Sequence, residues 1–152
     1  MKNINDLRED LDFANKFFRN KNFVKAEKLY KKIIKKFPSN FDANYFMASI
    51  KAQNNSFNEA KDYMEKANSI NPNLPELNNN LGLVYLNLNE IEKAIKYFQK
   101  AISLNKNYLL AYTNLGMAYV NQKKFRKLKN IILKRLKLIQ IIFSQIIILP
   151  IY

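Results

Sequence analysis

The segment Pro75–Tyr108, PELNNNLGLVYLNLNEIEKAIKYFQKAISLNKNY, is the best guide to the fold of this chain. Its small and apolar residues fall into two groups at helical spacing: Leu81, Gly82, Tyr85, Ala94, Phe98 and Ala101. Apolar residues at intervals of three and four predict amphipathic helices. If this segment is a repeating unit, the same residue types should recur at a constant distance along the chain.

Four columns of residues recur at a spacing of 34. The columns are Ala14, Ala48, Gly82 and Gly116; Ala26, Ala60, Ala94 and Leu128; Phe23, Phe57, Ile91 and Phe125; and Tyr30, Met64, Phe98 and Ile132. Small residues in the first two columns indicate close helix–helix approach. We predict that all four columns form the core, and that their aromatic members bind neither a cofactor nor nucleic-acid bases.

The order Leu81-Gly82-x-x-Tyr85, followed by Ala94-x-x-x-Phe98-x-x-Ala101, resembles the tetratricopeptide repeat, whose period is about 34 residues. The resemblance covers residues 7–128 and implies an all-α, right-handed α-solenoid of about three and a half helical hairpins, with eight helices. The expected array is 1–122, with repeats at about 7–40, 41–74 and 75–108 and a fourth that starts at 109. Such arrays are non-catalytic protein–protein interaction scaffolds or adaptors, which hold a peptide or partner helix in a concave groove.

Composition excludes most chemistry. The chain has 152 residues without a single cysteine or histidine, so disulfides, thiolate metal sites and histidine-based catalysis are absent. The acidic residues occupy outward or terminal positions, and both glycines lie in predicted helices and not in a phosphate-binding loop. We therefore predict no catalytic residues, no metal site, no cofactor and no enzyme activity.

The net charge of +14 is unevenly distributed. Residues 1–92 hold 14 Lys/Arg and all 12 Asp/Glu, whereas residues 93–152 hold 12 Lys/Arg and no acid. Such asymmetry is typical of nucleic-acid or anionic-membrane surfaces. The lysines before residue 123 lie mainly on outward helix faces, without interleaved exposed aromatics, so we predict no specific nucleic-acid binding, only weak charge-driven binding as an alternative. The first residues turn acidic without an apolar run, which predicts a cytoplasmic location.

The resemblance implies that the first helix of each repeat lines the groove. The peptide-binding candidates among these residues are Asn15, Tyr45, Ser49, Asn79, Asn80, Leu83, Asn114 and Met117. Asn80 and Asn114 share one repeat position and resemble an asparagine ladder, because an amide can donate to and accept from a peptide backbone. Asp12 and Phe46 occupy that position in the earlier repeats, and codon bias towards asparagine on a solvated face is an equal alternative.

A second family mode, the carboxylate clamp for acidic chaperone tails, is not expected. Its cationic positions hold Leu11, Glu76 and Asn80 in the first three repeats, and Tyr45, Leu110 and Asn114 in the last three. Glu76 would repel a carboxylate.

The segment 123–152 departs from the repeat pattern, because Leu128 and Arg135 replace the two alanines of the second helix. A buried arginine without a partner is costly, so this helix must pack differently or lie more exposed. Three alternatives remain. In the first, the helix caps the stack with Ile131, Ile132, Leu136 and Ile139; in the second, the basic segment 123–137 and the apolar segment 138–152 contact a membrane surface without spanning it. In the third, a shift of reading frame rewrote the fourth repeat. Resequencing of the gene beyond Phe125 tests the last.

Overall fold

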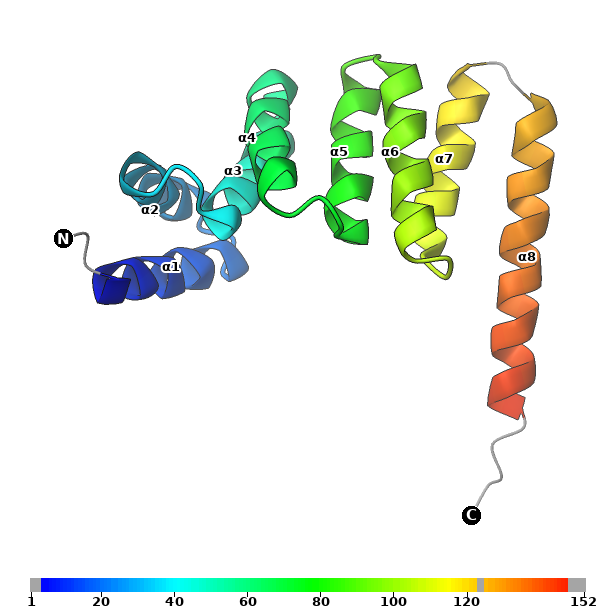
Figure 1. Cartoon of the computed structure of the whole chain (residues 1–152), viewed down its shortest axis with the longest axis horizontal. Coiled ribbons are helices and arrows are strands. Elements are labelled where there is room, and N and C mark those ends of the chain that lie inside the picture. Colours follow the sequence, from blue (N-terminus) through cyan, green and yellow to red (C-terminus); the bar gives the residue numbers. More distant parts are fainter. Residues whose placement is uncertain (1–3, 123–124, 148–152) are drawn as a thin grey trace.

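The computed structural model describes the backbone of residues 4–122 and 125–147, and the side chains of residues 6–122 and 130–144. This part of the chain is entirely helical apart from its connections (Figure 1). The helices are α1 Ile4–Arg19, α2 Phe23–Lys36, α3 Phe41–Gln53, α4 Phe57–Ile70, α5 Pro75–Asn87, α6 Ile91–Leu104, α7 Leu109–Asn121 and α8 Phe125–Ile147. The predicted all-α repeat fold is therefore confirmed over the described residues.

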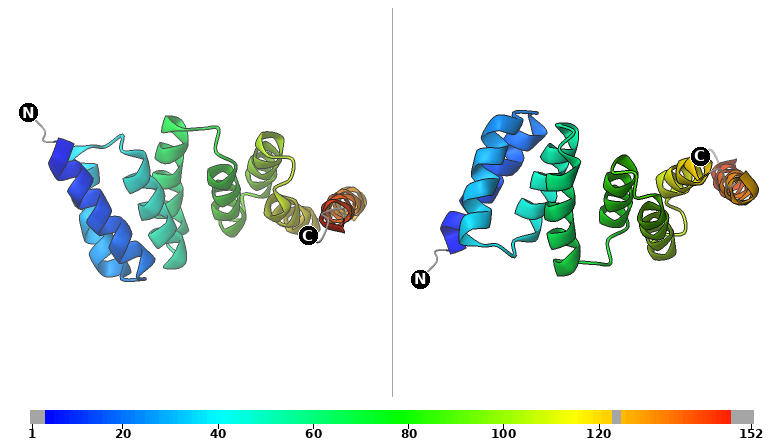
Figure 2. Two further views of the ribbon diagram at one scale, coloured as in Figure 1. Left: turned by 90° about the horizontal axis from the view of Figure 1, so that it is seen from below. Right: turned by 90° about the horizontal axis from the view of Figure 1, so that it is seen from above.

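The helices form successive hairpins that stack into one row. Each helix packs on the next, and first helices also meet across repeats where α1 contacts α3 and α5 contacts α7. Figure 2 shows the row from two opposite sides, with the N-terminus at one end of the stack and α8, seen nearly along its axis, at the other. This arrangement gives the molecule no single centre, because each hairpin is buried mainly by its neighbours.

The turn inside each of the first three hairpins has the same geometry. Lys21, Asn55 and Asn89 adopt φ values of 57°, 59° and 60° at a spacing of 34 residues. The amide of the following residue donates five residues back, as from Asn22 to the Phe17 carbonyl at 2.9 Å. This is the Schellman motif, which satisfies the last carbonyls of the first helix.

The first two turns between hairpins are held by buried asparagines that the sequence analysis missed. The Asn78 amide nitrogen donates to the carbonyls of Pro72 at 2.9 Å and Leu74 at 2.8 Å. Asn44 makes the equivalent bonds to Pro38 and Asn40, at 2.9 and 2.7 Å. The signal was present, because Asn44 and Asn78 are 34 residues apart and each follows a proline by six.

Among the described side chains, three of the four predicted columns lie in the core, with the exception of Ile132 in the fourth column. Their fully buried members are Ala14, Ala48, Gly82, Gly116, Ala26, Ala60, Ala94, Tyr30, Met64 and Phe98. The third column is half-buried at Phe23, Phe57 and Ile91, while Phe125 and Leu128 lie outside the described side chains. The prediction is wrong for Ile132, which is 49% exposed.

Helix α8 differs from the other helices in length and packing. It has 23 residues, whereas the others have 13 to 16, and its second half extends beyond the end of α7 (Figure 1). Of the four predicted capping residues, Ile131 and Ile139 are half-buried, but Ile132 and Leu136 are exposed. The helix therefore covers the stack with only part of its apolar surface. Within the described residues, no helix combines the length and apolar character needed to cross a membrane.

Candidate functional site

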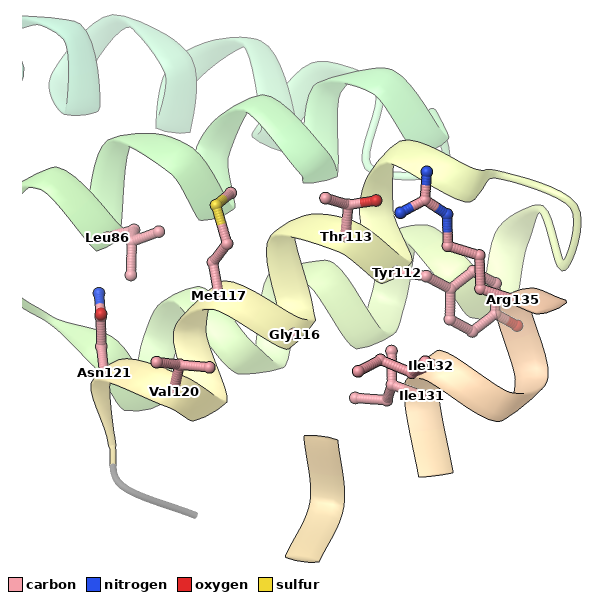
Figure 3. Close-up of a pocket in the computed structure, with 10 residues that line it drawn as sticks. All are labelled: Leu86, Tyr112, Thr113, Gly116, Met117, Val120, Asn121, Ile131, Ile132 and Arg135. Carbon is pink, nitrogen blue, oxygen red and sulfur yellow. The ribbon is translucent and has the colours of Figure 1, made fainter. Parts of the chain in front are cut away.

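Two pockets lie along the first helices of the repeats. The α3–α5 pocket has a volume of about 450 Å³ and is lined by Ser49, Ala52, Gln53, Phe57, Met64, Asn80, Leu83, Val84 and Asn87. The α7–α8 pocket has a volume of about 390 Å³ and is lined by Leu86, Tyr112, Thr113, Gly116, Met117, Val120, Asn121, Ile131, Ile132 and Arg135 (Figure 3). Both volumes fall within the usual range for ligand pockets, roughly 300–1,000 Å³.

Four of the eight predicted binding residues line these pockets. Ser49, Asn80 and Leu83 meet in the α3–α5 pocket, where a hydroxyl, an amide and an apolar side chain are close together. Met117 lies in the α7–α8 pocket and is 46% exposed. Small polar groups beside an apolar floor suit a peptide, because the backbone needs hydrogen bonds and the side chains need apolar contact.

Two predicted groove residues lie inside the protein. Asn79 and Asn114 are buried, and the Asn114 amide nitrogen donates to Asn79 Oδ1 at 2.8 Å. Their expected position on the groove surface is wrong, because both side chains turn into the contact between α5 and α7. This single hydrogen bond joins adjacent repeats, and neither side chain is exposed to a ligand.

The other two predicted residues also make hydrogen bonds within the stack. Tyr45 is half-buried, and its hydroxyl accepts a hydrogen bond from the Asn80 amide at 2.9 Å. Asn15 Oδ1 accepts from the Tyr30 hydroxyl at 2.7 Å, within the first hairpin. Asn80 thus joins α5 to α3 just as Asn114 joins α7 to α5, in both cases at a spacing of 35 residues. The asparagines predicted as a peptide ladder connect consecutive repeats.

Acidic side chains mark the first-helix surface in the N-terminal part of the stack. Asp12, Asp42 and Glu76 are exposed on α1, α3 and α5. Burial raises the pKa of Tyr45, and the Glu76 carboxylate raises that pKa further, against the opposing effect of the Asn80 hydrogen bond. Burial and the same carboxylate also raise the pKa of Tyr108. The first-helix surface near Glu76 is therefore electrostatically negative.

The α7–α8 pocket contains residues that the sequence analysis did not select for binding. Arg135 appeared only as a departure from the repeat, yet it lines this pocket together with Leu86, Val120 and Ile131 (Figure 3). The expectation that α8 would lie more exposed is confirmed there, because Arg135 is an exposed side chain. The signal that could have identified this residue was an arginine at a position that is small or apolar in the other repeats.

No metal-binding group of carboxylates occurs among the residues that the structure describes. The geometry at both pockets is that of a binding surface. The hydroxyl and amide groups are neutral, and the lining includes no carboxylate.

Comparison with known proteins identifies the class of the chain. Two family models described as tetratricopeptide repeat match it, one over residues 75–108 and the other over residues 17–79. The chain belongs to the tetratricopeptide-repeat family, whose members are protein–protein interaction scaffolds and in general not enzymes. The match over 75–108 coincides with the segment that opened the sequence analysis.

Solved structures show the same fold. A crystal structure of MamA superposes with a TM-score of 0.87 at 22% identity, covering 93% of this chain and 83% of that one. MamA 41-end from Desulfovibrio magneticus RS-1 gives 0.84 at 20% identity, covering 90% and 77%. YrrB, described as a TPR protein with an unusual peptide-binding site, gives 0.78 at 25% identity, covering 85% and 66%. No curated protein sequence matches the chain significantly.

Proposed function

We propose that this scaffold holds its partner as a peptide or helix along the first helices, with the α3–α5 pocket as its main contact. The observation that carries the proposal is the meeting of Ser49, Asn80 and Leu83 in that pocket. Asn80 is only half-buried and lines the pocket together with Leu83. YrrB, which is described as having a peptide-binding site, supports a peptide as the kind of partner.

Partner capture by matched variants tests this proposal. The full chain would be immobilised and its partners identified from cell extract, in parallel with Leu83→Glu and Val24→Glu. Val24 is the control because it is 83% exposed on the second helix α2 and lines neither pocket. A partner retained by Val24→Glu and lost from Leu83→Glu supports the proposal. A partner that binds both variants equally rejects the α3–α5 pocket as the binding site.

The absence of enzyme activity is part of the same proposal. The chain has no histidine and no cysteine, and the lining of the α3–α5 pocket offers only neutral polar groups. General acid–base catalysis needs a group that titrates near the working pH. Release of any covalent product from a bound partner by the purified chain would overturn this assignment.

Membrane-surface contact by α8 is a second candidate function. Exposed apolar side chains accompany the basic residues of this helix: Leu133, Leu136, Ile141, Ile142 and Phe143. Apolar and cationic side chains together favour binding to anionic lipid surfaces. Flotation with anionic vesicles should therefore fail for an Ile142→Glu/Phe143→Glu double variant and succeed for Val24→Glu. Equal flotation of both would reject the candidate. The predicted cytoplasmic location stays a prediction, which cell fractionation would test.

A further inference from the structure

The α7–α8 pocket has apolar walls that the protein itself leaves uncovered. Met117 and Val120 from α7 are 46% and 44% exposed, and Ile132 from α8 is 49% exposed. Figure 3 shows Ile131 and Ile132 facing the α7 side of the pocket, with Leu86 of α5 beyond Met117 and Val120. Apolar groups from three helices thus converge on one concavity, which is different from scattered exposed side chains.

One end of this pocket carries a cation without an acidic neighbour. Arg135 lies beside Tyr112 at that end (Figure 3). No described carboxylate forms an ion pair with Arg135, and residues 93–152 contain no Asp or Glu at all. The neighbouring Lys134 is placed differently, since its ammonium lies 5.5 Å from the centre of the Tyr112 ring and lines another pocket.

Tyr112 lies at the same end of the pocket. Tyr112 is buried to 2% exposure, and its hydroxyl has no hydrogen-bond partner among the described residues. Buried polar groups in proteins are nearly always paired. That hydroxyl is buried, so the donor that a partner's oxygen acceptor would meet at this end of the pocket is the exposed Arg135 guanidinium.

We propose that the α7–α8 pocket binds an acidic-apolar segment of the partner protein. A Leu, Ile, Met or Phe side chain of that segment fills the pocket between α7 and α8, and a carboxylate next to it pairs with Arg135. The inference rests on the proposed function, in which the first-helix surface holds a peptide. Arginine suits this role because its planar guanidinium forms two parallel hydrogen bonds to a carboxylate.

The charge distribution also fixes the direction of the bound segment. Asp42 and Glu76 on α3 and α5 would repel an acidic residue, whereas Arg135 would attract it. The acidic part of the partner therefore lies at the α8 end of the stack. A bilayer is a poorer occupant, since a flat lipid surface does not enter a concavity enclosed by α5, α7 and α8.

Three labelled peptides that differ only in charge test the proposal on the full chain. They are GSDLFDLSG, its neutral counterpart GSNLFNLSG and its basic counterpart GSKLFKLSG, measured by fluorescence anisotropy at physiological ionic strength. We expect the acidic peptide to bind about tenfold more tightly than the neutral one, because hydrogen bonds to charged groups are the strong ones. The basic peptide should bind most weakly.

Substitutions of Arg135 test whether this side chain causes the preference for the acidic peptide. Arg135→Gln should weaken the acidic peptide about tenfold and leave the neutral one unchanged, which corresponds to one charged hydrogen-bonded pair. Arg135→Glu should reverse the preference towards the basic peptide. Lys96→Gln is the matched control, since it removes one exposed positive charge from α6 outside the pocket. Arg135 is exposed, so these variants should fold, and circular dichroism checks this.

Several results would overturn the inference. These are equal binding of the three peptides, equal losses in Arg135→Gln and Lys96→Gln, Arg135-dependent binding to anionic vesicles without any peptide preference, or an Arg135-dependent dimer in sedimentation. The proposed function fails separately, when Leu83→Glu keeps the natural partner. A partner lost from Leu83→Glu, combined with equal binding of the three peptides, would reject this inference alone.

Discussion

At the scale of single residues, Gly82 and Phe98 show how closely neighbouring helices pack in the stack. A Cβ atom on residue 82 would lie 2.6 Å from Phe98 Cε1, and the Phe98 ring is fully buried. Well-packed cores resist added methyl groups at a cost of about 1–3 kcal/mol. Residue 82 must therefore be small, because the Phe98 ring of the same repeat lies directly opposite it.

We expect Gly82→Ala to destabilise the protein by about 1–2 kcal/mol in urea unfolding. The overpacking outweighs the helix propensity of alanine, which favours it over glycine by at most about 1 kcal/mol. In a Phe98→Leu background the same substitution should cost at least ~0.5 kcal/mol less, because the two sites are in contact. Equal costs in both backgrounds would mean that the ring is not the obstacle.

Lys21 is the least favourable of the three turn residues with positive φ. Its φ of 57° belongs to the left-handed region, which asparagine at residues 55 and 89 tolerates better than lysine. Lys21→Gly should therefore raise the free energy of unfolding by about 0.5–1 kcal/mol. Lys28→Gly, on an exposed face inside α2, should instead lower it by about 1 kcal/mol. Thermal unfolding of the two variants gives opposite signs if this is correct.

At the scale of helices, the α2–α3 loop and the α4–α5 loop each depend on one buried amide. Asn78→Ala removes two hydrogen bonds to the Pro72 and Leu74 carbonyls and should cost about 2–3 kcal/mol. Asn73→Ala, on an exposed residue of the same loop, should change stability by less than ~0.5 kcal/mol. Denaturant unfolding of both variants provides the comparison, and similar costs would contradict the role of Asn78.

An ion-pair cluster connects the first two hairpins. Lys51 of α3 lies 3.0 Å from Glu27 of α2 and 2.9 Å from Glu59 of α4. It occupies the repeat position of Tyr85, whose hydroxyl donates to Glu65 of the preceding helix. The lysine replaces a hydrogen bond between hairpins with charge pairing, so this junction should respond to pH.

The response follows from the carboxylate of Glu27. Hydrogen bonding to Lys31 and Lys51 lowers the pKa of Glu27, although burial opposes the shift. A lowered pKa in the folded state stabilises the protein above the ordinary pKa of glutamate, and this stabilisation is lost as the pH falls through the lowered pKa. Glu27→Gln should therefore cost roughly 0.5–1 kcal/mol at neutral pH and nothing at strongly acidic pH. Unfolding free energies across that range check the sign, with Asp62→Asn, an exposed carboxylate of α4, as the control.

At the start of a helix, a sequence pattern can predict a capping hydrogen bond that the structure does not form. Ser56 followed by Glu59 has the spacing of a capping box. Ser56 does stand at the N-cap of α4, yet its side chain makes no capping hydrogen bond, while Glu59 pairs with Lys51. A charged partner in the adjacent hairpin is available to Glu59, and the spacing alone does not contain that information.

At the scale of the whole molecule, the repeat period predicted the fold but not the rotation of each helix. The columns of Ala14 and Ala26 were predictable, because close packing admits only small residues there. Asn79 and Asn80 are adjacent, so about 100° of helix rotation separates a buried side chain from one at the pocket. A period of 34 residues does not determine that angle. Some of the predicted binding residues therefore line a pocket, whereas others are buried between helices.

The end of the stack was predictable only in part for a related reason. Arg135 indicated that α8 would not pack like α4 or α6, which is correct. The side chains that became exposed instead, such as Ile132, depend on how far the helix leans away from α7. That displacement is a property of neighbouring helices and is not encoded in the spacing along α8.

The hydrogen bonds between consecutive repeats determine which repeat is suited to duplication as a way of extending the array. Residues 75–108 contain both halves of the contact, since Asn79 accepts and Asn80 donates. Residues 41–74 supply only the acceptor Tyr45, because Phe46 stands where the donor belongs. A tandem duplication of 75–108 would thus lengthen the array with a hydrogen bond across the new junction. It should raise both the urea midpoint and the m-value, whereas duplication of 41–74 should raise the midpoint less. The third repeat is therefore the one best suited to extending the array by duplication.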